Sequence, residues 1–235
     1  ALTSLTKTDT PTAKLYAATP NLFRALLSLE PEEEGRTKAR QTILTTLPNA
    51  NPIAVCLLVR VLRTLGVTDN DRAKARHTIL TTLTNSDPQT VSDLIGELSA
   101  LEPTDKERTK ARQTILTTLT SAEPWEIPNL VPALSALEPT DEERTKARQI
   151  ILTIFPRTES TEVHFLTREL RTLGLTDDER TETRRTILTV LTNTAPHTTL
   201  DLISELLVLE PTDEEQTEAR QIILTALTNA DSIAV

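Results

Sequence analysis

The chain has 235 residues, with a formal net charge of −9, 2% aromatic residues and only four glycines. This acidic balance argues against a general affinity for nucleic acid or anionic membranes, because both are bound through Lys and Arg that neutralise phosphate. Cys56 is the only cysteine, so an intramolecular disulfide is excluded. The chain has no run of about 18 apolar residues and opens with no apolar signal segment, so we expect a cytoplasmic protein that does not enter a membrane.

In chain order, residues 1–19 differ from the rest, and we interpret them as a divergent N-terminal cap or linker. Residues 20–235 are predicted to form a single helical-repeat array. The segment RTKARQTILTTL occupies 36–47 and recurs unchanged at 108–119, with variants that begin at 72, 144, 180 and 216. The spacing is 36 residues without insertion or deletion, and a fixed period of this length is typical of repeat proteins.

Each repeat is predicted to begin with a helix, here named helix A. In LEPTDEERTKAR a threonine precedes a glutamate by three residues, the pattern of a capping box in which each side chain bonds the other residue's backbone N–H. This pattern occurs at Thr104 with Glu107, Thr140 with Glu143 and Thr212 with Glu215. The apolar residues that follow are spaced as one stripe of a helix; they are Ala111, Ile115, Leu116 and Leu119.

A second helix, helix B, follows a short turn such as TNSDP. Asp87 is the expected N-cap and Pro88 the first helical residue, where the missing N–H of proline is harmless. Its apolar positions have helical spacing and recur in a later repeat. They are Val91, Leu94, Ile95, Leu98 and Leu101, and then Val163, Leu166, Thr167, Leu170 and Leu173. Neither helix can bury its stripe alone, so stacking of neighbouring hairpins is required.

Tandem hairpins of two amphipathic helices resemble the α-solenoid class, which includes tetratricopeptide and HEAT proteins, over residues 20–235. The resemblance is one of architecture, because the tetratricopeptide pattern of Trp, Gly, Tyr and Phe is absent and its unit has 34 residues. Pumilio-type repeats have 36 residues, but they bind RNA through a basic, stacking face that this chain lacks. The predicted fold class is an all-α solenoid of about six 36-residue helix-turn-helix repeats, or about 12 helices.

A longer period of 108 residues is superimposed on the shorter one. Arg60, Arg63 and Gly66 match Arg168, Arg171 and Gly174, and Pro48 matches Pro156. The array is therefore interpreted as a duplicated block of three repeats. At its end, the NADSIAV of 229–235 repeats the NANPIAV of 49–55. We therefore expect the last hairpin to be truncated and the chain to be a fragment of a longer protein.

The repeats differ mainly at four positions of helix B, equivalent to Gln89, Ser92, Gly96 and Ser99. These positions lie along one helical face away from the apolar stripe. One hypothesis makes this face a recognition surface, with an aromatic anchor and arginine pairs that bind carboxylates or phosphates. Its candidate partner-binding residues are Arg60, Arg63, Trp125, His164, Arg168, Arg171 and His197. The alternative is that exposed positions drift freely and that duplication copied the arginine pairs.

Helix A also carries two recurrent arginines, such as Arg108 and Arg112, that would form ladders along the array. A phosphate-binding ladder is one interpretation. We favour charge balance between neighbouring hairpins, because acidic residues of the cap segment recur equally regularly, and pairs such as Glu34 with Lys38 and Glu142 with Lys146 have i, i+4 spacing.

The repeat that contains Trp125 is interrupted by Pro124, Pro128 and Pro132. An interior proline removes a backbone hydrogen bond and clashes with the preceding turn. Helix B of this repeat is therefore expected to begin at Pro128 and to bend near Pro132.

The sequence contains no enzyme signature, so no catalytic residue, cofactor site or metal site is predicted. His77, His164 and His197 lack ligand partners at metal spacing, and Cys56 has no paired histidine. The predicted function is a non-catalytic scaffold for protein or peptide interaction, as the repeat arm of a larger multidomain protein. The alternatives are a structural spacer or an end-to-end self-assembling rod and, with less support, a nucleic-acid-binding repeat protein.

Overall fold

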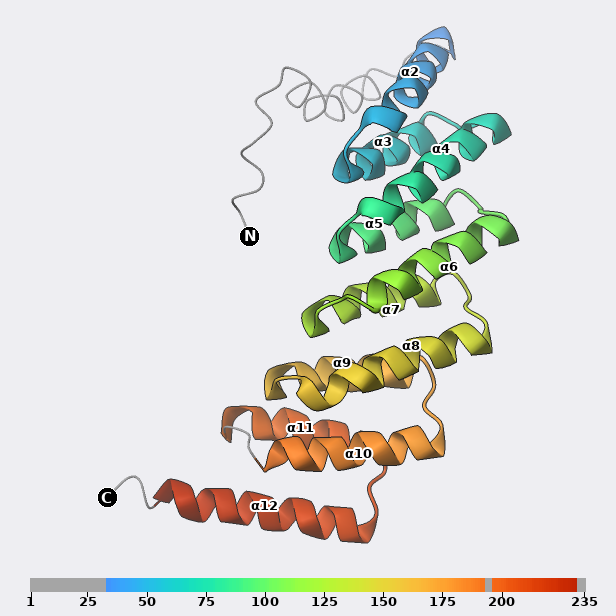
Figure 1. The fold of residues 1–235 in the computed structure, drawn as a ribbon. Coiled ribbons are helices and arrows are strands. Elements are labelled where there is room, and N and C mark those ends of the chain that lie inside the picture. Colours follow the sequence, from blue (N-terminus) through green and yellow to red (C-terminus); the bar gives the residue numbers. More distant parts are fainter. Residues whose placement is uncertain (1–32, 193–195, 232–235) are drawn as a thin grey trace. The chain divides into compact units, whose positions relative to one another are not determined.

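The structure is a computed structural model that describes residues 33–192 and 196–231 (Figure 1). Within these ranges the chain forms eleven α-helices and four short 3₁₀ helices, without any strand. The predicted all-α helical-hairpin architecture is confirmed. The segment predicted to be a cap or linker, residues 1–19, lies outside the described residues, as do the last four residues.

The helices alternate between two types, and both follow the predicted period. The A helices are α2 (Glu33–Thr46), α4 (Asp69–Thr82), α6 (Asp105–Leu119), α8 (Asp141–Ile154), α10 (Asp177–Leu191) and α12 (Asp213–Asp231). The B helices are α3 (Pro52–Thr64), α5 (Pro88–Ser99), α7 (Ile127–Ser135), α9 (Ser160–Thr172) and α11 (Pro196–Val208). Every A helix after α2 begins 36 residues after the previous A helix, at 69, 105, 141, 177 and 213. The 36-residue repeat is therefore a structural unit.

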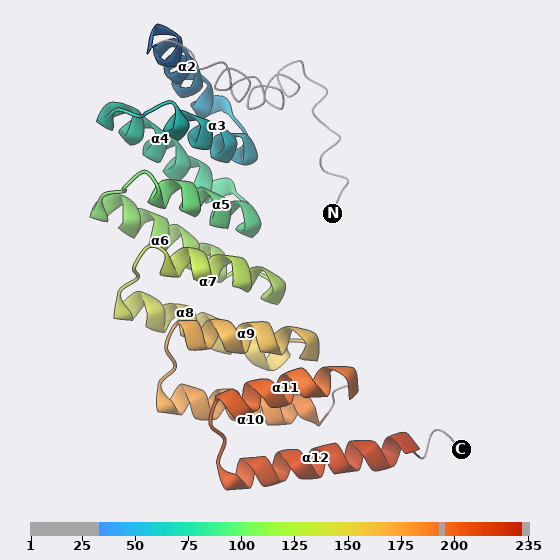
Figure 2. The ribbon, with the colours of Figure 1, turned by 180° about the vertical axis from the view of Figure 1, so that it is seen from behind.

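The chain divides into two compact units, residues 1–115 and residues 116–235, with the boundary inside α6. Within each unit the A helices form one layer and the B helices the other, as the views from opposite sides show (Figures 1 and 2). In the first unit α3 packs against α5 and α2 against α4. In the second, α9 packs against both α7 and α11, and α10 packs against α12.

The apolar stripes of both helix types form the core. Val91, Leu94, Ile95 and Leu98 of α5 are at most 1% exposed. Thr167, which replaces an apolar residue in α9, is fully buried, and its hydroxyl is satisfied by donating to the Val163 carbonyl oxygen at 2.9 Å. The predicted stripes are confirmed, including Ala111, Ile115, Leu116 and Leu119 in α6.

The predicted capping boxes of the A helices and the predicted cap of α5 are also confirmed. The Thr140 backbone N–H donates to the Glu143 carboxylate at 2.8 Å, and the Glu143 N–H donates to the Thr140 hydroxyl at 3.2 Å. Such boxes satisfy two of the N–H groups that the first turn leaves without partners. The Asp87 carboxylate caps α5 by accepting from the Thr90 N–H at 3.0 Å.

A left-handed residue ends every B helix, and this feature was not predicted. Its φ is 78° at Gly66 and 79° at Gly174. Glutamates occupy the equivalent place in the other repeats, with φ of 55° at Glu102, 54° at Glu138 and 55° at Glu210. These five positions are also 36 residues apart, so each repeat reverses direction through the same backbone conformation.

The late start predicted for the B helix of the proline-rich repeat is confirmed to within one residue, because α7 begins at Ile127 where Pro128 was expected. A 3₁₀ helix, η3 (Pro124–Glu126), occupies the place of the first turn. A 3₁₀ turn suits this segment because proline fixes φ without supplying an N–H donor. The other 3₁₀ helices, η1 (Leu47–Asn49), η2 (Leu83–Asn85) and η4 (Phe155–Arg157), each follow an A helix. The bend expected near Pro132, inside α7, stays a prediction.

Candidate protein-interaction surface

The recurrent arginine in the middle of α2, α4, α8 and α10 is an internal structural element. In α8, Arg148 donates to the Leu173 carbonyl oxygen at the end of α9 at 3.1 Å, and to Glu179 in the first turn of α10 at 2.8 Å. Arg184 of α10 makes the equivalent bonds to Leu209 at 3.2 Å and Glu215 at 2.8 Å. These guanidiniums neutralise the negative end of a B helix and the capping acid of the next A helix. The first unit repeats the bond to the end of the B helix at Arg40 and Arg76.

These contacts shift the pKa of the capping glutamates. Burial alone would raise the pKa of Glu179, but hydrogen bonds from the Thr176 backbone N–H and the Arg148 guanidinium outweigh it and lower the pKa. The pKa of Glu107 is lowered in the same way, with Arg76 as the cation. The carboxylates are therefore held in the charged form that the arginines require.

The arginine near the start of the A helices also has internal contacts, and α12 carries Gln216 in its place. Arg72 pairs with the left-handed Glu102, and Arg180 pairs with the left-handed Glu210 at 3.3 Å. The Arg108 side chain instead donates to the Pro103 carbonyl oxygen at 3.3 Å. Ion pairs between consecutive hairpins, such as Arg76 with Glu107 at 2.9 Å, support the charge balance favoured from the sequence. Lys38 pairs with Glu34 at 3.4 Å as predicted, but Glu142 and Lys146 form no ion pair in the described part of the chain.

The candidate residues Arg60 and Arg63 have an internal partner that sequence reasoning missed. Both guanidiniums of α3 donate to Glu97 of α5, each at 3.0 Å. The Glu97 side chain is only 6% exposed, whereas those of Arg60 and Arg63 are 59% and 39% exposed. The pair therefore neutralises a buried carboxylate while part of each guanidinium still faces solvent. The sequence signal is a charged residue inside the apolar run of helix B.

The equivalent arginines of the second unit are held more loosely. The Arg171 guanidinium lies 3.9 Å from the Glu205 carboxylate, and Arg168 pairs with its neighbour Glu169 at 3.0 Å. Burial is the main cause that raises the pKa of Glu169 and of Glu205, although the adjacent arginines oppose it. The side chains of Arg168 and Arg171 are 56% and 43% exposed. Partly exposed arginines beside a less exposed glutamate are therefore common to both units.

His164 and His197 are the two histidines among the candidate partner-binding residues. His164 of α9 is half-buried, and its ring centroid lies 3.7 Å from that of Phe165. The Arg168 guanidinium lies 5.8 Å from the centroid of the same Phe165 ring. His164, Phe165 and Arg168 therefore form one local cluster on α9. The His197 side chain lies outside the described residues.

Trp125, the predicted aromatic anchor, is 62% exposed at the start of the proline-rich repeat. It lies in η3, which is closed by reciprocal capping between Glu123 and Glu126. Other large exposed apolar residues also lie on B helices. They are Ile53 in the first unit (62% exposed), and Leu200 (76%), Leu207 (58%) and Val208 (48%) in the second. Comparison of the repeats with one another identified the positions of Ile53, Leu200 and Leu207 as variable, but it did not single out Val208.

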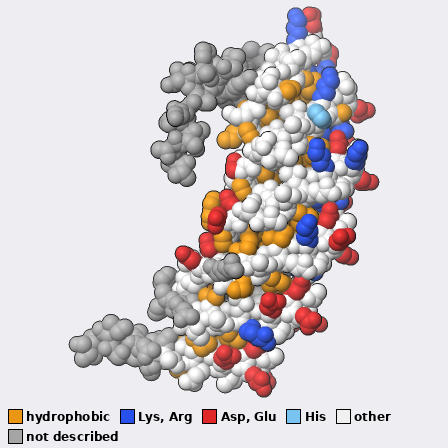
Figure 3. All heavy atoms as spheres, viewed as in Figure 1, with side chains coloured by type: hydrophobic (Ala, Val, Ile, Leu, Met, Phe, Trp, Pro, Cys, Tyr) orange, Lys and Arg blue, Asp and Glu red, His pale blue; other side chains and the backbone are white. Residues whose placement is uncertain are grey.

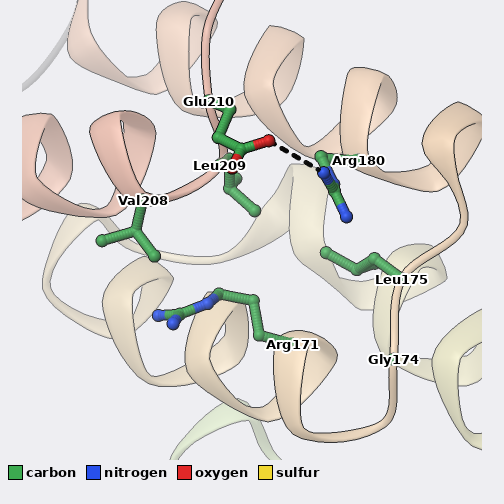
Figure 4. Close-up of a pocket in the computed structure, with 7 residues that line it drawn as sticks. All are labelled: Arg171, Gly174, Leu175, Arg180, Val208, Leu209 and Glu210. Carbon is green, nitrogen blue, oxygen red and sulfur yellow. Dashed lines mark hydrogen bonds and ion pairs between the residues drawn. The ribbon is translucent and has the colours of Figure 1, made fainter.

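A pocket of about 240 Å³ adjoins Arg171 where α9 ends and α10 begins. Its lining includes Gly174, Arg180, Val208 and Glu210. Figure 4 shows the Arg180–Glu210 pair on one side of this pocket and Arg171 near Val208 on the other. The pocket therefore places a partly exposed cation beside an exposed apolar side chain.

The remaining candidates are the reactive thiol of Cys56, a metal site and a membrane-spanning helix. Cys56 is buried, and desolvation raises the pKa of its thiol to about 12, so the nucleophilic thiolate is disfavoured near neutral pH. Over residues 33–192 and 196–231, no cluster of three His, Cys, Asp or Glu side chains is arranged to hold a metal ion. Among the described helices, none is both long and apolar enough to cross a membrane.

Comparison with known proteins adds no family to this description. No protein-family model matches the chain, and a search of curated proteins found no significant relative.

Proposed function

We propose that the chain is a non-catalytic helical-repeat scaffold that binds a protein or peptide partner along its B helices. The observation that carries this proposal is the position of exposed apolar side chains. Of six large apolar residues exposed in the described part of the chain, five lie on the B side of a repeat and only Leu224 lies on an A helix. Exposed aromatic and aliphatic residues that differ between repeats can form a specific binding surface.

The arginine pairs add polar recognition to this surface. A guanidinium has five N–H donors, and the contact with Glu97 uses only part of those of Arg60 and Arg63. In the second unit Arg171 lies close to the exposed Val208. We therefore propose a partner segment that carries apolar side chains together with carboxylates. The unpaired Cys56 is compatible with the reducing cytoplasm, where we place this scaffold.

Nucleic acid is a less favoured ligand. The arginines that recur along the A helices, such as Arg148 and Arg184, are bound to carboxylates and backbone carbonyls, and the chain is acidic overall. Binding that falls steeply with salt would be the signature of phosphate contacts. Absence of nucleic-acid binding at low salt would remove this alternative.

Site-specific photocrosslinking tests the proposal. A photoreactive residue is placed at 125 or at 168, and at 149 on α8 as a control, because Gln149 is also exposed but lies on an A helix. We expect one or more defined protein adducts at 125 and 168 and none at 149. Equal labelling at all three positions would show that the B helices are not the binding surface.

Self-association is the second candidate function, and it is favoured by the apolar residues exposed on α11 and α12: Leu200, Leu207, Val208 and Leu224. A rod that assembles through these residues would give a light-scattering mass that rises with protein concentration. A scaffold for other proteins would keep the mass of one chain over the same range. Comparing wild type with Leu200→Ser at several concentrations separates these two functions.

A further inference from the structure

In the described ranges, five turns connect a B helix to the next A helix, and each contains one left-handed residue. Where this residue is glutamate, its carboxylate can pair with the arginine near the start of the A helix of the same hairpin, 30 residues earlier. The pairs of this kind are Arg72 with Glu102 and Arg180 with Glu210. Figure 3 shows charged side chains of both signs on the side where the A helices begin. A turn with such a pair therefore neutralises its own arginine.

The turn at Gly174 differs from these turns in two ways. Glycine supplies no carboxylate, and the arginine that would pair with one, 30 residues earlier, is Arg144 of α8. The turn also gains an arginine, Arg171. Its sequence is RTLG at 171–174, whereas the turns with glutamate read SALE at 99–102 and 135–138 and LVLE at 207–210. Relative to those turns, the turn at Gly174 has lost one negative charge and gained one positive charge.

Both arginines keep hydrogen-bond donors that are not in use. Arg144 donates from Nε to the Pro139 carbonyl oxygen at 3.3 Å, but it forms no ion pair with the residues that the structure describes. The Arg171 guanidinium lies 3.9 Å from the Glu205 carboxylate and donates no hydrogen bond within the described ranges, whereas the equivalent arginine of the first unit donates at 3.0 Å. Because a guanidinium has five N–H donors, each of the two can still bind a carboxylate.

The space that a glutamate side chain would enter at this turn is open. A Cβ added at Gly174 would meet no atom within 4 Å. The pocket of about 240 Å³ also adjoins Gly174, and Arg171 and Arg180 contribute to its lining. Arg180 is paired with Glu210, and Arg171 lies apart from this pair (Figure 4). Arg171 is therefore the cation of this pocket that is available to a ligand.

We propose that the turn at Gly174 binds an acidic segment of a partner protein. One carboxylate of the segment pairs with Arg144, in place of the glutamate side chain that other turns supply, and a second pairs with Arg171 in the pocket. Carboxylate is favoured over phosphate because the chain itself uses carboxylates for the equivalent arginines. A second copy is the weaker occupant, because the first-turn glutamates of the A helices already cap their own helices and pair with arginines, as Glu179 does with Arg148.

This inference rests on the proposed function, since the ligand is a protein, but it uses a turn instead of the outer face of the B helices. A fluorescent hexaglutamate peptide tests it with the full 235-residue chain, at about 20 mM salt so that screening is weak. We expect a saturable rise in fluorescence anisotropy, and none with hexaglutamine. Arg144→Ala and Arg171→Ala should each weaken binding about tenfold. No saturation up to about 1 mM chain would overturn the proposal.

The sharpest variant restores the missing carboxylate. Gly174→Glu should weaken peptide binding at least about tenfold, because the new side chain pairs with Arg144 as Glu210 pairs with Arg180. Gly174→Gln has the same backbone cost without the charge and should bind within about threefold of wild type. Thr189→Glu and Arg185→Ala change the net charge by the same amount at exposed positions of α10 and should also stay within about threefold. Unchanged binding by Gly174→Glu, or an equal loss in these controls, would contradict the assignment.

Other occupants and the B-helix surface are tested separately. Tighter binding of a fluorescent hexathymidylate than of hexaglutamate, lost in Gly174→Glu, would assign the site to phosphate and overturn the choice of carboxylate. Dimers in light scattering that Gly174→Glu abolishes would assign it to a second copy and overturn the choice of a separate partner. Adducts at 125 without peptide binding would overturn this inference alone. Peptide binding without adducts at 125 or 168 would overturn the B-helix surface alone.

Discussion

The Arg148 guanidinium donates to the Leu173 carbonyl oxygen at 3.1 Å, across 25 residues of sequence. The same guanidinium contacts both carboxylate oxygens of Glu179, at 2.8 and 3.0 Å. One side chain of α8 thus connects the carboxyl end of α9 with the amino end of α10. Because those two ends belong to consecutive repeats, this contact holds successive hairpins in their relative positions within the second unit.

Removal of this contact should destabilise the protein. Arg148→Ala leaves the Leu173 carbonyl and the Glu179 carboxylate without their partner, and the Arg148 side chain is only 8% exposed. We expect the free energy of unfolding to fall by about 2–3 kcal/mol. Urea denaturation monitored by circular dichroism measures the change.

The matched control is Arg185→Ala, which removes an arginine from an exposed position of α10 and should change stability by less than about 0.5 kcal/mol. Arg148→Lys should recover only part of the loss, because an ammonium cannot reproduce the planar fork. Equal stability of the Arg148→Ala and Arg185→Ala variants would contradict the structural role of Arg148.

The capping glutamate should make stability depend on acid pH. The pKa of Glu179 is lower in the folded state than its ordinary value of 4.5. Its contribution is therefore fully present above that ordinary value and is lost as the pH falls through the lowered pKa. Glu179→Gln should consequently destabilise the protein at about pH 7 but differ less from wild type at about pH 3. Urea midpoints across this range measure the difference.

Glu169 should behave with the opposite sign. Burial raises its pKa above 4.5 in the folded state, so its ionisation opposes folding as the pH rises through the raised pKa. Glu169→Gln should therefore gain stability relative to wild type between about pH 4 and pH 7. A constant difference between the two proteins over this range would show that Glu169 titrates normally.

Two glycines should respond oppositely to alanine. Gly174 has a φ of 79°, a left-handed conformation that costs an alanine about 1 kcal/mol, so Gly174→Ala should lower stability by that amount. Gly96 lies inside α5, and Gly96→Ala should raise stability by about 0.5–1 kcal/mol. A Cβ at either position meets no atom within 4 Å, so steric clash does not confuse the comparison. Thermal unfolding of both variants measures the two signs.

Apolar spacing was sufficient to predict the hairpins, because the buried positions of α5, such as Leu94 and Leu98, follow directly from helical geometry. It was insufficient for the contacts between hairpins. The pairing of Arg60 with Glu97 depends on which faces of α3 and α5 meet, and that is a property of packing rather than of local sequence. The sequence does not indicate the left-handed conformation of Glu102, because glutamate rarely adopts a positive φ.

The Glu97 contact gives a further prediction. With both Arg60→Ala and Arg63→Ala, a carboxylate that is 6% exposed loses its cations, and stability should fall by about 2–4 kcal/mol. Adding Glu97→Gln should recover part of this loss, because the amide carries no charge to desolvate. Wild type, the double-alanine variant and the variant that adds Glu97→Gln are compared by urea denaturation. If Glu97→Gln lowers stability further in the double-alanine background, the buried charge is not the cause.

The last prediction separates binding from folding at Trp125. Because this side chain is 62% exposed, Trp125→Ala should change the free energy of unfolding by less than about 0.5 kcal/mol. If Trp125 is an anchor of the proposed interaction surface, the same substitution should weaken binding of a partner captured by photocrosslinking at 168 by at least about tenfold. Titration calorimetry with the purified partner measures the dissociation constant.

A control on the other helix layer completes this test. Gln149→Ala changes an exposed residue of α8 and should leave the dissociation constant unchanged. If Trp125→Ala leaves partner binding unchanged while adducts still form at 168, the partner contacts Arg168 and Arg171 and does not contact Trp125. A large loss of stability in Trp125→Ala would instead give the tryptophan a structural role in η3, where it lies between the capping residues Glu123 and Glu126.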